Sequence, residues 1–267
     1  MLAPVIAYSE NPPPSLLFME SASVYHSKAG LTEPSGLAAR LEGGYWVVSD
    51  DTSSVFAIDK QGHLIERIDV GPSVPDLEGV AGISATQHLV LLSEKDAAIV
   101  EFNAESGRVT ASHPILAMKG GDSIDFGKDG PEGIAIDEKG LVWVLVERPP
   151  QLLQVSHGFD EIARIIDLDS LPGFTGRKPL HKVDASGLAY DRSRKALWIL
   201  SDEGKAVFYI QADAKRAVRF DLIYGKKDRK VRRVDNPEGI AISHDGSVLS
   251  IVTDDGKSSR LYRYEIQ

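Results

Sequence analysis

Short apolar stretches recur along the whole chain, each bounded by turn-forming or charged residues. A clear example is residues 129–150, which read DGPEGIAIDEKGLVWVLVERPP. Residues 133–136 and 141–146 are rich in β-branched and aromatic side chains, and the turn sequence EKG lies between them. This pattern predicts two strands joined by a tight turn. Because an antiparallel pair returns the chain to the side on which it began, we expect Glu132 and Glu147 to lie close together.

The same unit occurs five times, with a glycine at the start of each first strand. These glycines are Gly36, Gly79, Gly133, Gly187 and Gly239. Their spacings of 43, 54, 54 and 52 residues, with four short strands in a full unit, are typical of a β-propeller. The fifth unit has only three strands, whereas residues 15–27 alternate like a strand that precedes the first unit. We predict an all-β, five-bladed β-propeller whose last blade is closed by the N-terminal strand, with negligible helix.

The length and composition agree with one propeller domain. The chain has 267 residues, of which 42% are hydrophobic, enough for a sizeable core. Residues 1–14 contain three consecutive prolines, which a paired strand does not tolerate. We therefore predict an N-terminal extension at residues 1–14 and a single domain at residues 15–267.

Charge and cysteine content exclude several classes of function. The chain has no cysteine, so disulfides, thiolate metal sites and cysteine nucleophiles are absent. A net charge of -9 argues against nucleic acid as a partner. No apolar run approaches the roughly 20 residues of a transmembrane span. We expect a monomer whose ligand is a small molecule or a protein.

Aligning the five units produces two series of polar residues. The residues that precede the glycines are Ser35, Glu78, Glu132, Ser186 and Glu238. The residues one past the end of the second strands are Asp50, Glu94, Glu147, Asp202 and Asp254. Because the first strand of each propeller blade lines the central channel, the first series should converge at the axis, with the second series slightly outside it.

A ring of carboxylates predicts a bound cation. Carboxylates that share a site raise one another's pKa, and a divalent cation removes this conflict. Calcium accepts about six to eight oxygen ligands in flexible geometry, whereas magnesium requires a stricter octahedron. Zinc favours histidine or cysteine, and neither series contains them. We therefore predict a Ca²⁺ site, with five candidate ligands at Glu78, Glu132, Glu238, Glu94 and Glu147.

Structural roles are the alternative for these acids. The inner glutamates would then accept backbone N–H groups from a neighbouring blade, and Lys95 and Arg148 would form ion pairs with the glutamates that precede them. Asp50, Asp202 and Asp254 occur in turn-like sequences, and we interpret them as turn caps. Two basic loops, at residues 173–183 and 225–233, are expected on the same face as the acids. Such charge runs are usually solvated, and the alternative is an anion-recognition rim around the acidic centre.

The ordered motifs SGL, DLEGV, PEGIA with VERPP, DASGLAY with LSDE, and NPEGIA resemble the SdiA-regulated family of bacterial proteins. That family is distantly similar to NHL-repeat propellers, and the resemblance spans about residues 15–267. It implies a five-bladed propeller with a calcium site, in proteins usually exported or tethered at the N-terminus. It implies no established activity. We expect an extracytoplasmic (periplasmic or membrane-tethered) location, with the cytoplasm as the alternative.

Two functions are compatible with these features. The first is a calcium-binding propeller that recognises a ligand or protein partner on its acidic face without turnover. The second is a calcium-dependent hydrolase, a lactonase or phosphodiesterase, in which the metal polarises an ester and a carboxylate acts as base. Four cations of the basic loops would then hold an anionic substrate, namely Arg177, Lys178, Lys226 and Lys227. The sequence contains no G-x-S-x-G elbow, P-loop or G-x-G-x-x-G motif, and we favour the first function.

Overall fold

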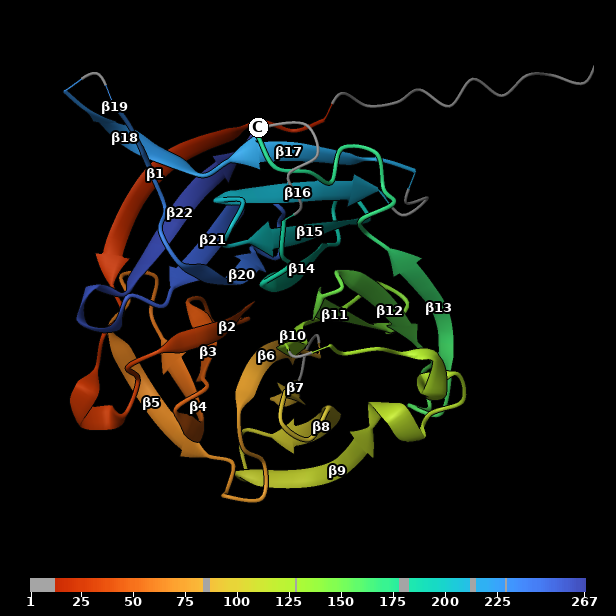
Figure 1. Cartoon of the computed structure of the whole chain (residues 1–267). Coiled ribbons are helices and arrows are strands. Elements are labelled where there is room, and N and C mark those ends of the chain that lie inside the picture. The colour runs from red at the N-terminus through yellow and green to blue at the C-terminus, as the bar shows by residue number, and fades with distance from the viewer. Residues whose placement is uncertain (1–12, 84–86, 128, 178–182, 212–214, 229) are drawn as a thin grey trace, which may run out of the picture.

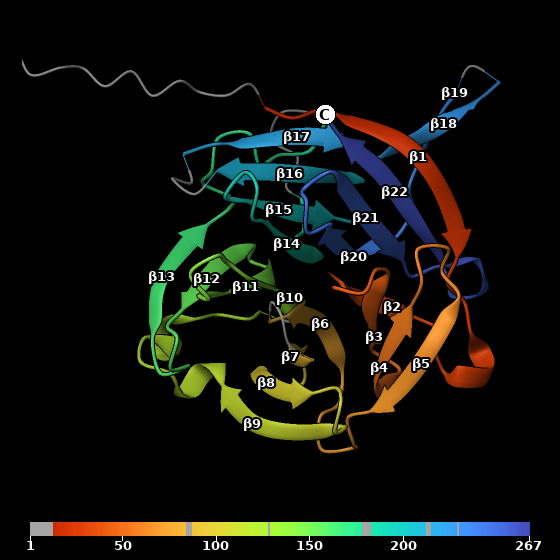
Figure 2. The same cartoon turned by 180° about the vertical axis from the view of Figure 1, so that it is seen from behind.

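The described part of the chain forms five four-stranded antiparallel sheets arranged around a central axis (Figures 1 and 2). The structure is a computed structural model that describes residues 13–83, 87–127, 129–177, 183–211, 215–228 and 230–267. Most of the predicted extension, residues 1–12, lies outside the described residues. The five-bladed propeller predicted from the repeats is confirmed.

Blades one to three each use four consecutive strands, and the first strand of each is innermost. Blade one contains β2 (Pro34–Ala39), β3 (Tyr45–Ser49), β4 (Thr52–Ile58) and β5 (Leu64–Asp69). Blade two contains β6 (Leu77–Gly82), β7 (His88–Ser93), β8 (Ala98–Asn103) and β9 (Arg108–Pro114). Blade three contains β10 (Asp129–Ile136), β11 (Val142–Arg148), β12 (Gln151–Val155) and β13 (Ile162–Asp167).

The last two blades close the ring. Blade four contains β14 (Gly187–Asp191), β15 (Ala196–Ser201), β16 (Ala206–Gln211) and β17 (Ala217–Asp221). Blade five contains β20 (Pro237–Ile242), β21 (Val248–Thr253), β22 (Arg260–Ile266) and, outermost, β1 (Leu16–Ser23). The pairing of β1 with β22 joins the two ends of the chain, and Ser15 and Gln267 exchange both backbone hydrogen bonds at 2.9 and 3.0 Å. The predicted N-terminal closure is thus confirmed, and it covers what would otherwise be an open sheet edge.

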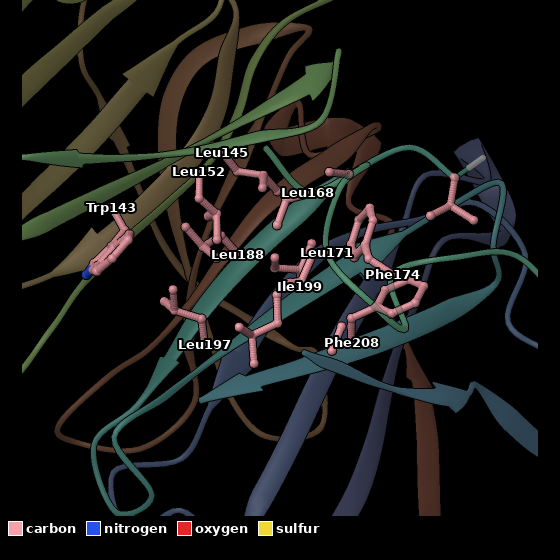
Figure 3. Close-up of a cluster of buried hydrophobic side chains, with 14 of the residues drawn as sticks. Trp143, Leu145, Leu152, Leu168, Leu171, Phe174, Leu188, Leu197, Ile199 and Phe208 are labelled. Carbon is pink, nitrogen blue, oxygen red and sulfur yellow. The ribbon is translucent and has the colours of Figure 1, made fainter. Parts of the chain in front are cut away.

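The blades are held together by apolar side chains packed between neighbouring sheets. In Figure 3, Leu145 and Leu152 of blade three face Leu188, Ile199 and Phe208 of blade four. The second strands β3 and β15 are buried along their whole length, because both of their faces pack against a neighbouring blade. Full burial of one such Leu or Phe contributes about 1.5–3 kcal/mol, so the stacked blades supply the main favourable term in folding.

One hairpin and several short turns lie outside the blades. The hairpin formed by β18 (Ile223–Lys227) and β19 (Lys230–Arg233) projects past the edge of the ring beside β1 (Figure 1). In the described part of the chain, helix is limited to three-residue 3₁₀ turns, which are η1 (Ser27–Ala29), η2 (Ile115–Ala117), η3 (Gly121–Ser123) and η4 (Gly256–Ser258). Among the described residues, no helix has the length and apolar character needed to cross a bilayer.

At the axis, the five repeat glycines let neighbouring first strands approach closely. A Cβ atom added to Gly187 would lie 2.3 Å from the carbonyl oxygen of Glu238, and one added to Gly239 would lie 2.5 Å from that of Ser35. Gly36, Gly79 and Gly133 meet the next blade in the same way. The glycines therefore form a narrow neck in the channel, and the two ends of the channel widen into separate cavities.

Candidate acidic cation site

A β-bulge places each inner glutamate at the channel mouth. In blade two, Leu77 pairs with Ser93 and Gly79 pairs with Leu92, so Glu78 has no partner in the ladder. The same shift leaves Glu132 and Glu238 unpaired in blades three and five. A bulge bends the strand and redirects a side chain. All three glutamates consequently reach one cavity at the axis.

This cavity, which we call the acidic cavity, has a volume of about 310 Å³ and is lined almost entirely by oxygen-bearing side chains. Its lining consists of Ser35, Asp50, Glu78, Glu132, Glu147, Arg148, Asp184, Ser186, Asp202, Glu203, Glu238 and Asp254. Both predicted series therefore converge here, except for Glu94. Among the lining residues, Arg148 is the one cation.

Four of the five predicted cation ligands line the acidic cavity, and Glu94 lies behind them. The carboxylate of Glu94 accepts a hydrogen bond from the backbone N–H of Gly130 at 2.9 Å. It also forms a second acidic group with Asp76 and Glu78, in which one oxygen of each residue lies within 4.8 Å of the others. Glu78 thus belongs both to the acidic cavity and to this neighbouring group.

The electrostatics of the acidic cavity are unfavourable without a cation. Burial, followed by the charge of Glu78, raises the pKa of Glu132 to about 10. Burial and the neighbouring carboxylate of Asp50 raise the pKa of Glu78 to about 8. Burial also places the pKa of Glu238 well above its ordinary value. These carboxylates therefore hold protons near neutral pH unless a cation replaces them.

The outer aspartates both cap turns and face the acidic cavity. Asp50 accepts a hydrogen bond from the backbone N–H of Asp51 at 2.7 Å, and Asp254 accepts one from Gly256 at 3.4 Å. The interpretation as turn caps is confirmed for these two residues. Asp202 differs, because no group among the described residues donates a hydrogen bond to its buried Oδ1 atom. That oxygen is buried in the cavity wall without a protein partner.

Arg148 is a counter-charge on the blade-four side of the acidic cavity. Its guanidinium lies 3.0 Å from Asp129, 2.9 Å from Glu147 and 2.9 Å from Glu203. The predicted pairing with Glu147 is confirmed. Even with this cation adjacent, burial raises the pKa of Glu147 to about 7. The positive charge is therefore shared among several carboxylates and neutralises only one side of the cavity.

Sequence reasoning missed Asp184 and Glu203. Asp184 is buried and accepts hydrogen bonds from the Ser201 hydroxyl and the Glu203 backbone N–H. A third series contained the signal, because the residues three before the glycines are Glu33, Asp76, Gly130, Asp184 and Asn236. Gly130 is the member without a side chain, and a Cβ there would lie 2.4 Å from Cγ of Glu94.

The described parts of the two basic loops do not line the acidic cavity. Arg177 and Arg233 both pair with Asp221, at 2.9 and 3.4 Å. Lys226 and Lys227 lie on the projecting β18–β19 hairpin, where Tyr224 packs against aromatic rings of blade five. Lys178 lies outside the described residues. The described cations thus belong to the periphery rather than to an anion-binding rim.

The fold and site define a five-bladed β-propeller with an acidic cavity at one end of its axis. A model of the family described as SdiA-regulated matches residues 34–254, and the chain belongs to this family.

Other proteins are more distant. A ribulose-phosphate 3-epimerase of Bacillus subtilis is 26% identical over 180 residues, which cover 63% of this chain and 78% of that protein. The crystal structure of Myxococcus xanthus glutaminyl cyclase has a TM-score of 0.65 at 10% identity and covers 96% of this chain and 97% of its own. A luciferin-regenerating enzyme has a TM-score of 0.53 at 13% identity, with 94% and 95% covered. At such identities the structural likeness concerns the fold alone.

Proposed function

We propose that this protein binds Ca²⁺ in the acidic cavity and uses the cation-loaded face to recognise a ligand or protein partner. The observation that carries the proposal is the convergence of three bulged glutamates, from three different blades, on a single cavity. Among the described residues, no group donates a hydrogen bond to the carboxylate of Glu132 or Glu238. A cation would therefore be the partner that allows these two carboxyl groups to lose their protons near neutral pH.

The donor chemistry favours calcium. Among the described residues, the available ligands are carboxylate and hydroxyl oxygens, and no histidine lines the acidic cavity. Oxygen ligands from several blades suit the larger, flexible coordination of Ca²⁺ better than the strict octahedron of Mg²⁺. Glu78, Glu132 and Glu238 would hold the ion, and the unpartnered oxygen of Asp202 and the carboxylate of Glu147 would complete the set.

The size of the acidic cavity supports recognition as well as metal binding. A single cation with its ligands fills only part of about 310 Å³, and the cavity lies at a mouth of the channel. A calcium ion whose protein ligands come from one side retains sites for water or for oxygen atoms of a visiting molecule. A carboxylate, phosphate or hydroxyl group of a ligand would bind there.

Calorimetric titration of chelator-treated protein with Ca²⁺ tests the proposal. Saturable binding should stabilise the fold, by about 2.7 kcal/mol at a calcium concentration 100 times Kd. Glu132→Gln should weaken binding at least about tenfold, because a charged ligand is lost. Glu66→Gln is the matched control, since Glu66 is exposed on β5 away from the cavity. Absence of binding up to about 10 mM, above the range of the weakest extracellular calcium sites, contradicts the proposal.

A hydrolase is the second candidate, and Glu147 is the observation that favours it. Its carboxyl has a pKa of about 7 and lies in the cavity beside Arg148. Such a group exchanges protons readily near neutral pH, and calcium would supply polarisation of an ester when bound. A panel of lactones and phosphodiesters, assayed with and without Ca²⁺, tests this function. If no compound in the panel is hydrolysed, the hydrolase function is excluded. If hydrolysis persists in Glu147→Gln, Glu147 is not the base.

The activity named for the Bacillus subtilis relative is not proposed for this chain. An identity of 26% over 63% of this chain is too low to carry an activity across, and among the described residues the lining of the acidic cavity contains one cation. Arg148, the cation of its lining, is already held by several carboxylates.

We also propose an extracytoplasmic location, which is supported by the family resemblance. Fractionation of cells that express the full-length protein tests this location.

A further inference from the structure

The β18–β19 hairpin, which we call the basic ribbon, is a separate two-stranded sheet at the outer edge of the propeller (Figures 1 and 2). It projects past the ring beside β1. Its described residues include one acid, Asp228, and five cations, namely Lys226, Lys227, Lys230, Arg232 and Arg233. The whole chain, in contrast, has a net charge of -9. The basic ribbon is therefore a locally positive surface on an acidic protein.

The base of the basic ribbon is fixed to the propeller. Leu222 and Val234, which flank the ribbon, are fully buried, and the Val234 N–H donates a hydrogen bond to the Leu222 carbonyl oxygen at 3.0 Å. Tyr224 packs against the rings of Phe18 and Tyr262, with centroid distances of 6.2 and 5.2 Å. The direction of the ribbon relative to blade five is thus set before any partner binds, which lowers the entropic cost of binding.

Charge compensation differs between the base and the tip of the basic ribbon. At the base, Arg233 pairs with Asp221 at 3.4 Å. Toward the tip, Lys227 and Lys230 lie directly opposite each other in the ladder, and among the described residues neither forms an ion pair. Like charges at directly opposed positions destabilise a strand pair. The tip therefore contains a repulsion that an anion beside the two lysines would relieve.

Three exposed cations share one face of the basic ribbon. Lys227 and Lys230 are paired in the ladder, and Arg232 comes two residues after Lys230, so all three side chains point to the same side. Opposed positions on a face are about 5 Å apart, and successive positions along a strand are about 7 Å apart. The guanidinium of Arg232 lies over the ring of Tyr224, 4.8 Å from its centroid. The three cations thus form a compact positive face.

The small size of this face favours a lipid surface over a folded protein partner. A stable protein interface uses about 20–30 residues on each side, more than the short ribbon at residues 223–233 contains. An anionic bilayer sets no such minimum, because each Lys or Arg near its surface raises partitioning by about fivefold. Ile223, at the base of the ribbon, is 37% exposed and supplies an apolar contact of the kind found at membrane interfaces.

We propose that the basic ribbon is a peripheral contact site for an anionic phospholipid surface, with headgroup phosphates on Lys227, Lys230 and Arg232. The projection of the ribbon brings its cations to the surface first, while the acidic cavity remains at the axis. This separation matters because repulsion between like charges is screened over about 8–10 Å at physiological salt. The contact would turn the edge of blade five toward the bilayer, and it does not depend on the calcium site.

Flotation of the full chain with lipid vesicles tests the proposal. Vesicles of equal parts phosphatidylglycerol and phosphatidylcholine should carry the protein with them, whereas vesicles of phosphatidylcholine alone should not. A chelator is present throughout, so that calcium cannot bridge the protein and the lipid. Binding should be lost at about 1 M salt, where the Debye length falls to about 3 Å.

Two double variants separate the basic ribbon from the overall charge of the protein. Lys227→Gln combined with Lys230→Gln should lower partitioning into anionic vesicles about 25-fold. Lys60→Gln combined with Arg108→Gln makes an equal charge change at exposed positions of blades one and two, and it should lower partitioning less than about twofold. A thermal melt verifies folding. The ribbon variant should melt no lower than the unmodified protein, because it removes an opposed pair of like charges.

Soluble anions distinguish a bilayer from other partners. Glycerol phosphate, poly-glutamate and duplex DNA are each added at a concentration of negative charge equal to that of the vesicles, and none should release the protein. Release by any of them would overturn the proposal in favour of a free phosphate, an acidic protein or a nucleic acid. Equal flotation with the two kinds of vesicle, or undiminished flotation of the folded ribbon variant, would also overturn it.

If the ribbon variant does not fold, the comparison of the two kinds of vesicle and the dependence on salt decide. Because calcium is absent throughout, a negative result here leaves the calcium proposal untouched, and failure of calcium binding leaves this site untouched.

Discussion

Nη1 of Arg148 lies 2.9 Å from Oε1 of Glu147, its neighbour in the sequence. Both side chains line the acidic cavity, so the guanidinium already neutralises part of the charge that a metal would neutralise. Arg148 pairs on the side of blades three and four, while Glu78 and Glu238 belong to blades two and five. The cavity is therefore divided into a side with a resident cation and a side without one.

Replacing Arg148 should strengthen calcium binding and weaken the metal-free protein. Arg148→Gln removes one positive charge from beside the acidic cavity, so we expect calcium affinity to rise about threefold to tenfold, a modest change because the side chain is partly solvated. The melting temperature in chelator should fall, since Glu147 and Glu203 lose their partner. Calorimetry with Arg108→Gln as the control measures both effects. Weaker calcium binding would instead show that Arg148 organises the ligands.

The stability of the metal-free protein should decrease as pH rises above about 4.5. Glu78 and Glu132 have folded-state pKa values of about 8 and about 10, against 4.5 when unfolded. The folded state then binds more protons than the unfolded state between these limits, so unfolding becomes easier with increasing pH. Saturating Ca²⁺ replaces these protons and should remove most of the slope. Thermal melts at pH 5, 7 and 9, with chelator or with calcium, measure this pH dependence of stability. If stability changes with pH equally with and without calcium, the glutamates do not share a calcium site.

The neck should not tolerate a side chain at Gly187. In Gly187→Ala the new methyl group would lie 2.3 Å from a backbone oxygen of the next blade, and such overpacking costs about 1–3 kcal/mol. Gly82→Ala is the matched control, because its methyl group would meet nothing closer than 4.0 Å. Urea unfolding of both variants measures the difference. Equal stability would mean that the blades separate easily at the axis.

The closing strand should depend on its inward-facing aromatic residue. Phe18 packs edge-on against Tyr264, with the ring centroids 5.7 Å apart, whereas the adjacent Leu17 is 53% exposed. Phe18→Ala should lower the free energy of unfolding by about 2 kcal/mol, which is less than the loss expected for a fully buried Phe. Leu17→Ala should lower it by less than about 0.5 kcal/mol. Urea unfolding compares the two. If Leu17→Ala destabilises the protein as much as Phe18→Ala, the face of β1 that carries Leu17 contributes equally to packing.

Much of the fold follows from local patterns. The repeat period, the alternation of apolar residues and the unfilled fourth strand of the last unit were sufficient to predict five blades and their closure. These features repeat, and each blade meets only its two neighbours, so one unit specifies its contacts in the same way as the next. The convergence of the two acidic series also followed, because the first strands of a propeller meet at the axis.

What only the tertiary structure decided is how individual carboxylates are used. Glu94 and Glu147 occupy the same place in the repeat, yet Glu94 is held by the Gly130 backbone outside the acidic cavity and Glu147 lines it beside Arg148. That difference arises because Gly130 in the next blade has no side chain to fill the space. The bulges that aim Glu78, Glu132 and Glu238 depend on strand register. Residue order determines which acids gather at the axis, but contacts between blades determine which of them face the cavity and what compensates their charge.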